Sequence, residues 1–353
     1  MIRFFKIVFV FVMSLTIFSC NKVDDPVEAY VVPYAEQYPK DLLAIETFLK
    51  THSITTINNA GLPDDQDVTF ALVPAGDANS IWGSAAVHKP SLLEKNVTRH
   101  DINYKVYYIS SREGVKKTPT SVDSIFVSYK GEYIYTKKEE VVPATNPVTY
   151  NSFISSKEFD QARNPVWFTL DGVIQGWKEI MTLFKSGTNT VNPNGSVDYA
   201  DFGAGVMFLP SGLAYYNGFV GSIPNYSPLI FSFKLQEVNY VDSDYDRIDS
   251  KDEGYNVLTN TYTQDTDGDG RLDYLDQDDD GDSYLTKFEI KKPAPFLGTS
   301  LYYPFSPIAD DPATTTIDES EPKGIPSASG DGVTTTRLRR HLDRNSHPPF
   351  TTY

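Results

Sequence analysis

The most constraining feature of this sequence is a short helix seed that contains a Gly-Trp pair and lies between apolar, aromatic-rich strands. The seed spans residues 173–184 and follows an expected strand at 166–170. Because Tyr and Phe favour strands and dominate the aromatic residues here, strands around one short helix predict an α+β fold with an antiparallel sheet. The other expected strands are residues 104–109, 124–129, 206–209 and 229–238.

An ordered set of residues across this region carries a family resemblance. The set is Tyr129, Phe159, Asp160, Val173, Ile174, Trp177, Tyr215, Ile223 and Phe231. In this order and spacing, over about residues 104–240, the chain resembles the FKBP-type peptidyl-prolyl cis–trans isomerases. The resemblance implies a sheet wrapped around a short helix and a proline pocket with Trp177 as its floor. It also implies that the Ile174 N–H and the Tyr215 hydroxyl bind substrate carbonyls.

The activity that this resemblance implies needs only a shaped apolar pocket. Rotation about a peptide bond is opposed by a barrier of about 18–20 kcal/mol, because resonance keeps the bond planar. The two forms of an X-Pro bond nevertheless differ by only about 0.5–1 kcal/mol. An apolar pocket favours the twisted, less polar amide over the planar one. We therefore expect no cofactor for catalysis.

Several departures from the family pattern leave a second function open. Val166 stands where an aromatic residue is usual, and Tyr216 stands where Gly is usual. Arg163 is shifted from the position of the family's Asp-pairing Arg, and Phe168 is expected in the core. The alternative is a non-catalytic FKBP-like chaperone or surface-assembly binding module.

A run of acidic loops follows the expected isomerase domain. Residues 242–282 contain 15 Asp and Glu against 3 Lys and Arg, which accounts for most of the formal net charge of −16. Carboxylates at alternate positions around a Gly are typical of loops that wrap a hard cation, and their number favours Ca²⁺ over Mg²⁺. The expected ligands are Asp265, Asp267, Asp269, Asp273, Asp276, Asp278, Asp280, Asp282 and Glu289.

The spacing of these loops resembles thrombospondin type 3 repeats more than an EF-hand. Residues 242–249 form a looser copy of the pattern, and a solvated acidic linker is the alternative interpretation. We expect the Ca²⁺ to be structural and to stiffen the segment after the isomerase domain. A further alternative makes calcium binding primary, in a spacer or adhesion module. A chain with this acidic charge is not expected to bind nucleic acid.

The amino-terminal residues are typical of an exported bacterial lipoprotein. A basic start at 1–6 and an apolar run at 7–18 precede Cys20, which is the only cysteine of the chain. Residues 17–20 resemble a lipobox, which implies that a lipid on Cys20 anchors the protein to a membrane. The alternatives are a cleaved signal with an incidental Cys, or an uncleaved anchor. We expect an outer-membrane-anchored protein of the cell envelope that acts on proline-containing exported polypeptides.

The sequence predicts six consecutive segments. They are a signal peptide (1–19), a tether (20–40), an amino-terminal extension (41–103), the isomerase domain (104–240), a calcium-binding repeat segment (241–290) and a tail (291–353). The extension is expected to begin with an amphipathic helix at 41–51, and residues 134–152 and 188–205 are expected to be irregular insertions. The tail is expected to be disordered, unless its basic patch at 335–342 folds back on the acidic loops.

Overall fold

The structure is a computed structural model that describes residues 30–83, 91–141, 148–292, 300–305, 324–326 and 338–349. The predicted signal peptide and Cys20 lie outside the described residues. Every helix and strand given below belongs to one compact unit, residues 34–353. Within the described ranges, no helix combines the length and apolar character that crossing a membrane requires.

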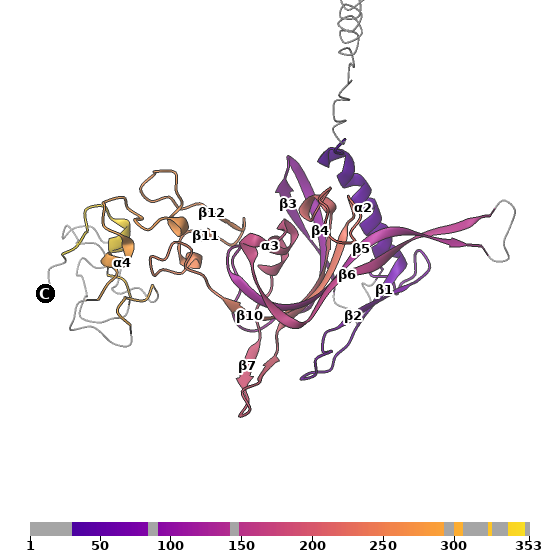
Figure 1. Cartoon of the computed structure of the whole chain (residues 1–353), viewed down its shortest axis with the longest axis horizontal. Coiled ribbons are helices and arrows are strands. Elements are labelled where there is room, and N and C mark those ends of the chain that lie inside the picture. Colours follow the sequence, from indigo (N-terminus) through magenta and orange to yellow (C-terminus); the bar gives the residue numbers. More distant parts are fainter. Residues whose placement is uncertain are drawn as a thin grey trace, which may run out of the picture. The chain divides into compact units, whose positions relative to one another are not determined.

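A six-stranded antiparallel sheet forms the centre of this unit (Figure 1). Its strands, in spatial order, are β3 (Leu92–Arg99), β4 (Ile102–Arg112), β9 (Gly203–Leu209), β10 (Leu229–Asn239), β5 (Ser124–Glu140) and β6 (Tyr150–Thr169). Each neighbouring pair is antiparallel, and the β5–β6 and β10–β5 ladders contain register shifts. This confirms the expectation of a mixed fold built on an antiparallel sheet.

Side-chain alternation along the strands gives the sheet two apolar faces. On β10, Phe231 and Phe233 lie in the core that includes the short helix α3 (Gln175–Met181). Ile230, the residue before Phe231, points to the opposite face and lies in a second core with the long helix α2 (Tyr34–Thr51). Helices therefore pack on both faces of the sheet, and α3 is the helix that the Gly-Trp seed predicted.

Helix α2 begins at Tyr34, so the prediction of a tether up to residue 40 is wrong. The tether was inferred from the prolines, and Pro39 does lie inside the helix. A proline there removes one intrahelical hydrogen bond. Packing outweighs that loss, because Gln37 and Asp41 are buried and Ile45, Phe48 and Leu49 are fully buried.

The sheet begins before residue 104, where the isomerase domain was expected to start. Strand β3 pairs with β4 along its whole length, from Leu92 with Ile109 to Arg99 with Ile102. Only Val97 of this strand is buried, so its sequence carries little of the apolar alternation that identifies a strand. A separate hairpin of β1 (His52–Thr56) and β2 (Val68–Leu72) contributes Ile54 and Val68 to the core beneath α2.

Both expected insertions contain regular hairpins. Strands β5 and β6 continue as a two-stranded ribbon beyond the sheet, pairing from Ile134 with Ser156 to Glu140 with Tyr150 (Figure 1). Residues 188–205 hold β7 (Thr188–Val191), β8 (Val197–Ala200) and the start of β9. These residues were misread because a hairpin that is mostly exposed on both faces can be polar throughout, which removes the strand signal.

The carboxy-terminal segment is irregular, as the sequence predicted. Its short elements are η3 (Ser250–Asp252), β11 (Tyr255–Asn256), β12 (Thr261–Tyr262), η4 (Asp273–Leu275), α4 (Thr286–Glu289) and η6 (Arg340–Leu342). A small core of Ile248, Ile290, Tyr303 and Ile325 holds it together. The tail folds back here, because Arg340, within the basic patch, donates to the Lys291 carbonyl at 3.3 Å, and Arg344, just after the patch, donates to the Gly281 carbonyl at 2.9 Å.

Candidate functional site

A cavity of about 260 Å³ opens between the sheet, the start of α3 and the loop before β10. Its lining is mainly aromatic and apolar, with one carboxylate. The lining residues are Tyr129, Phe159, Asp160, Phe168, Gly172, Val173, Ile174, Trp177, Tyr215 and Phe231. The chain thus brings together residues from β5, β6, α3, β10 and two loops.

Trp177 is the floor of this cavity. It is buried in the first turn of α3, and its ring meets Tyr129, Phe168 and Phe231 edge to face, with centroids 5.6, 6.0 and 5.3 Å away. Edge-to-face pairs at such distances are favourable aromatic contacts. The preceding Gly176 is required for close approach, because a Cβ there would lie 2.4 Å from a methyl carbon of Leu209. Gly176 therefore determines how closely α3 approaches β9, and with it the position of the Trp177 indole at the base of the cavity.

The wall on the β10 side depends on a second glycine. Phe159 meets Phe231 edge to face at 5.7 Å, and both rings lie over Gly131 of β5. A Cβ at Gly131 would lie 2.7 Å from Cζ of Phe159 and 2.9 Å from Cε1 of Phe231. Since only glycine leaves room for both rings, this backbone position sets the width of the cavity.

A tyrosine–carboxylate pair supplies the polar part of the lining. The Tyr129 hydroxyl donates a hydrogen bond to Oδ2 of Asp160, whose Oδ1 accepts from the Gln161 N–H at 2.9 Å. Burial, and then the hydrogen bond to Asp160, raises the pKa of Tyr129 well above its usual value. The phenol therefore stays protonated at neutral pH and holds the Asp160 carboxylate in a fixed orientation.

Two further polar groups face the same space. Residue Ile174 precedes α3 in an extended conformation, and its carbonyl accepts from the Trp177 N–H at 3.0 Å. Its own N–H makes no hydrogen bond to another group in the described part of the chain. Tyr215 is half-buried, and burial, followed by the charge of Asp160, raises its pKa. Both groups can donate to a carbonyl of a bound peptide.

The loop that carries Tyr215 is held by helix α2. Tyr216 has a φ of +53°, the left-handed region that favours glycine. Its ring stacks on Tyr34 at 4.1 Å and meets Tyr226 edge to face at 5.0 Å. The chain thus keeps the backbone angle that a glycine would adopt, and aromatic packing against α2 stabilises it.

Eight of the nine residues predicted for the pocket line the cavity. The exception is Ile223, which is buried in the adjoining core and bridges Val220 across a tight turn. Phe168 packs against the core, as expected, and also lines the cavity, where it approaches Tyr129 at 5.7 Å. Arg163 donates to Gln161, not to Asp160.

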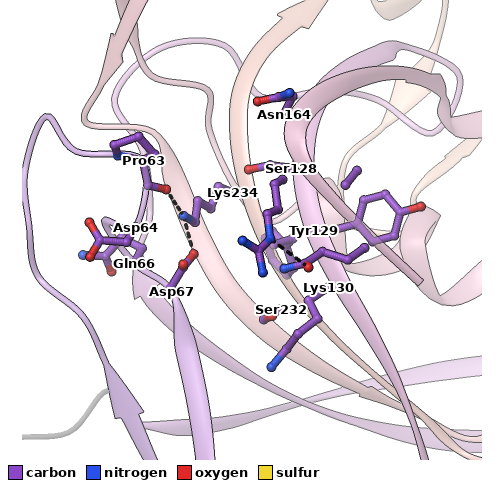
Figure 2. A pocket seen from close by; sticks show the side chains of 14 residues that line it. Pro63, Asp64, Gln66, Asp67, Ser128, Tyr129, Lys130, Asn164, Ser232 and Lys234 are labelled. Carbon is purple, nitrogen blue, oxygen red and sulfur yellow. Dashed lines mark hydrogen bonds and ion pairs between the residues drawn. The ribbon is translucent and has the colours of Figure 1, made fainter. Parts of the chain in front are cut away.

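A second, larger cavity of about 410 Å³ lies beside the first and shares only Tyr129 with it. Its lining is mainly polar, and Figure 2 shows the Lys234 ammonium facing the loop of Pro63, Asp64, Gln66 and Asp67. Lys234 pairs with Asp67 at 2.5 Å and donates to the Pro63 carbonyl at 2.9 Å. Its charged groups already have partners, and it lacks the aromatic walls of the smaller cavity.

The acidic loops bring some of their predicted ligands together. Asp265, Asp267 and Asp269 form one group, and Asp278, Asp280 and Asp282 form another, each with carboxylate oxygens within 4.8 Å of one another. Glu289 is buried near the second group. Burial, and then the charges of Asp280 and Asp282, raises the pKa of Glu289 to about 9. Oxygen-only groups of this kind suit Ca²⁺.

Two predicted ligands lie outside these groups. Both oxygens of Asp273 accept hydrogen bonds from Thr266, from its N–H at 2.8 Å and from its hydroxyl at 2.7 Å. Asp276 accepts from the Asp278 N–H and lies 3.5 Å from the Arg271 guanidinium. Spacing in the sequence predicts that both bind the cation. In the structure both accept hydrogen bonds within the loop, and their role as ligands stays a prediction.

A third acidic group was missed by the sequence analysis. It consists of Asp244, Asp246, Glu253 and Asp279, all buried. Only the first two lie in the looser repeat at 242–249, and Glu253 and Asp279 follow no spacing rule. Only the three-dimensional structure identifies it, because its four carboxylates come from three stretches of the chain that converge in the interior.

Comparison with known proteins relates parts of the chain to two families. The chain is 29% identical over 163 residues to the FKBP-type peptidyl-prolyl cis-trans isomerase FkpA of Buchnera aphidicola, covering 45% of this chain and 50% of that protein. It therefore spans about half the length of that curated relative. Residues 243–316 match the family described as BamM C-terminal. The chain is thus related, at low identity and over part of its length, to FKBP-type isomerases.

Three solved structures are similar to part of the chain. FkpA from Escherichia coli is 26% identical, with a TM-score of 0.27, over 41% of this chain and 51% of that one. A peptidyl-prolyl isomerase from Pseudomonas syringae pv. tomato is 21% identical, with a TM-score of 0.27, over 41% and 80%. The N-terminal domain of FKBP42 from Arabidopsis thaliana is 16% identical, with a TM-score of 0.28, over 42% and 96%.

Proposed function

We propose that this protein is a peptidyl-prolyl cis–trans isomerase of the FKBP type that acts on proline bonds of exported polypeptides. The observation that carries the proposal is the cavity of about 260 Å³ with the Trp177 indole as its floor. Tyr129, Phe159 and Phe231 surround that floor, and the Ile174 N–H faces the same space. The similarity to FkpA over 45% of the chain supports the same activity.

In this proposal the aromatic side chains that line the cavity bind the proline ring and exclude water from the adjoining amide. The barrier of about 18–20 kcal/mol arises from amide resonance, which is lost as the bond twists. The twisted amide is less polar than the planar one, so a water-poor site favours it. The Ile174 N–H and the Tyr215 hydroxyl hold flanking carbonyls while the bond turns, and no proton is transferred.

The surroundings of this activity are proposed from the two partial similarities. FkpA-type similarity and the match to the BamM C-terminal family both support a cell-envelope location, and the second supports an association with outer-membrane assembly. A lipid on Cys20 would hold the protein at the membrane, close to exported clients. Two Ca²⁺ ions, one on Asp265, Asp267 and Asp269 and one on Asp278, Asp280, Asp282 and Glu289, would stiffen the segment after the isomerase domain.

A protease-coupled assay with a proline peptide tests the activity. Trp177→Ala should lower kcat/KM by at least about tenfold, because without the indole the cavity no longer holds the proline ring in the correct position. Trp167→Ala is the matched control, since Trp167 is exposed on β6 and does not line the cavity. Tyr215→Phe, which removes only a hydroxyl, tests the site without deleting core volume.

The same experiment separates the two functions that the sequence left open. Wild-type protein that fails to accelerate isomerisation above the uncatalysed rate would end the enzymatic proposal. Suppression of client aggregation by that inactive protein, lost in Trp177→Ala, would establish a non-catalytic chaperone that uses the same cavity.

A further inference from the structure

Four carboxylates from three stretches of the chain meet in the interior of the carboxy-terminal segment. They are Asp244, Asp246, Glu253 and Asp279, and oxygens of all four lie within 4.8 Å of one another. Their exposed fractions are 6, 0, 3 and 2%. Water therefore screens these four charges poorly. The two groups in the acidic loops, called the surface groups here, are more exposed, and Asp280 alone among their six carboxylates is buried.

Most oxygens that face the interior of this cluster have no hydrogen-bond partner in the protein. One oxygen of Asp244 accepts from the Asp246 N–H (3.1 Å), and one of Asp246 accepts from the Ile248 N–H (2.7 Å). The unpartnered atoms are Asp244 Oδ2, Asp246 Oδ2, Asp279 Oδ1 and both Oε atoms of Glu253. Buried polar atoms without partners are rare in native proteins and mark a missing ligand.

No basic side chain compensates the four charges among the described residues. The ion pairs nearby join Lys251 to Asp249 and Asp252, and Arg271 to Asp276. Buried charges in native proteins are normally paired or coordinate a metal, and a divalent cation among these four carboxylates would supply the missing positive charge.

We propose that Asp244, Asp246, Glu253 and Asp279 bind one buried Ca²⁺, separate from the two ions proposed for the surface loops. The donors are oxygen only, which disfavours zinc and copper. Four carboxylates offer up to eight oxygens, and Ca²⁺ takes six to eight. Mg²⁺ retains several waters and requires near-octahedral geometry, which suits a buried, carboxylate-rich cluster poorly.

This site explains the consecutive acidic residues at 278–280. Asp278 and Asp280 belong to the surface group, while Asp279, between them, belongs to the buried group. One short stretch of backbone therefore serves two cation sites. The buried ion would join this stretch to the turns of Asp244, Asp246 and Glu253, which directly follow the last strand of the sheet. All four ligands lie within residues 243–316, the range that matches the BamM C-terminal family.

Calcium stoichiometry of the purified full chain tests the proposal. The protein is stripped with EGTA at neutral pH, titrated with CaCl₂ by calorimetry, and its bound calcium is measured by mass spectrometry after gel filtration. Glu253→Gln should bind one Ca²⁺ fewer than wild type and should show a smaller rise in Tm on adding calcium. Asp252→Asn is the matched control. It removes one negative charge at the residue next to Glu253, and the Asp252 side chain pairs with Lys251 and is not part of the cluster. It should retain the wild-type stoichiometry.

A second variant keeps the test decisive if Glu253→Gln fails to fold. Asp267→Asn combined with Asp280→Asn disables the two surface groups and leaves the buried ligands intact. This variant should retain one bound Ca²⁺ per chain. The proposal is overturned if the double variant binds none, or if folded Glu253→Gln binds as many ions as wild type, which would mean that the cluster is held by protons. Loss of the surface ions alone would leave the buried site standing.

Discussion

The Asp41 carboxylate accepts two hydrogen bonds from Ser211, one from its backbone N–H at 2.8 Å and one from its hydroxyl at 2.6 Å. The two residues are far apart in the chain, and both are fully buried. Gln37, one turn earlier on α2, donates to the other oxygen of Asp41 at 2.6 Å. Helix α2 is therefore bonded to the start of the loop that presents Tyr215 to the cavity.

Removing this bond should disturb both stability and catalysis. Asp41→Ala leaves two buried donors of Ser211 without a partner, which costs about 1–3 kcal/mol of folding free energy. We also expect a several-fold loss of kcat/KM, because Tyr215 lies only four residues after Ser211. Urea unfolding and the proline-peptide assay measure the two effects. Lys40→Ala, an exposed neighbour on the same helix that pairs with Glu36, should leave both unchanged. Equal activity in wild type and Asp41→Ala would show that α2 does not position the loop.

A methyl group at Gly131 should change the width of the cavity by displacing the two rings of its wall, Phe159 and Phe231. A Cβ at Gly131 overlaps the rings of Phe159 and Phe231, at 2.7 and 2.9 Å, so both rings must move. We expect Gly131→Ala to lower kcat/KM by at least about tenfold, since small displacements of positioning groups are costly. Gly172→Ala is the control on the same cavity, because its Cβ meets only Thr169 Oγ1 at 3.9 Å. If the two variants behave alike in the assay, the width of this wall does not limit catalysis.

His52 should make the folded state sensitive to mild acid. Its ring is buried and stacks on Phe48 at 3.9 Å, and this burial lowers its pKa below the usual 6.5. The unfolded chain therefore takes up a proton more readily than the folded chain when the pH falls below 6.5. Stability is fully present above that pH and declines as the pH falls toward the folded-state pKa, by at most about 1.4 kcal/mol per pH unit.

Urea unfolding at pH 7.5 and 5.5 checks this expectation. His52→Gln removes the titrating group, so its stability should change less between the two pH values than that of wild type. His100, whose pKa is also lowered by burial, remains in both proteins and contributes equally to each. An identical pH dependence in the two proteins would assign the acid sensitivity to other groups.

The sequence predicted the pocket better than it predicted the elements around it. Trp177 and Tyr215 were found because each lies in a short local motif whose spacing is set by one helix or one loop. Ile223 was misplaced because its role depends on turn geometry, and the second role of Phe168, in the cavity lining, depends on strand register. A shift of one residue along a strand moves a side chain to the other face, and the letters alone do not specify that shift.

The contacts that join distant segments could not be read from the sequence. The sequence places Asp41 only at the start of a predicted helix, because a capping residue and a buried acceptor look alike before the partner is known. The same holds for Glu253, which lies in no repeat and whose neighbour Asp279 is distant in the sequence. Tyr216 stands where Gly is usual, and the stacking of Tyr34 of α2 on its ring, which accompanies its left-handed φ, could not be predicted.

Asp273 and Asp267 should respond differently to substitution, although the loop pattern assigns both to one cation. Asp273 is buried and accepts two hydrogen bonds from Thr266, whereas Asp267 belongs to the carboxylate group with Asp265 and Asp269. Asp273→Ala should therefore lower stability by about 1–3 kcal/mol even in EGTA, with the calcium content unchanged. Asp267→Asn should lose one bound ion and change stability in EGTA very little, because its carboxylate is only half-buried.

Unfolding in EGTA and calcium analysis of the same preparations separate the two roles. Asp267→Asn serves as the reference for a lost ligand, and wild type serves as the reference for loop stability. If Asp273→Ala loses an ion as Asp267→Asn does, then Asp273 is a ligand and its bonds to Thr266 rearrange on binding. If Asp273→Ala keeps the ion and loses stability, Asp273 fixes the loop backbone that the cation site requires. The spacing of carboxylates in the sequence then predicts more ligands than the site uses.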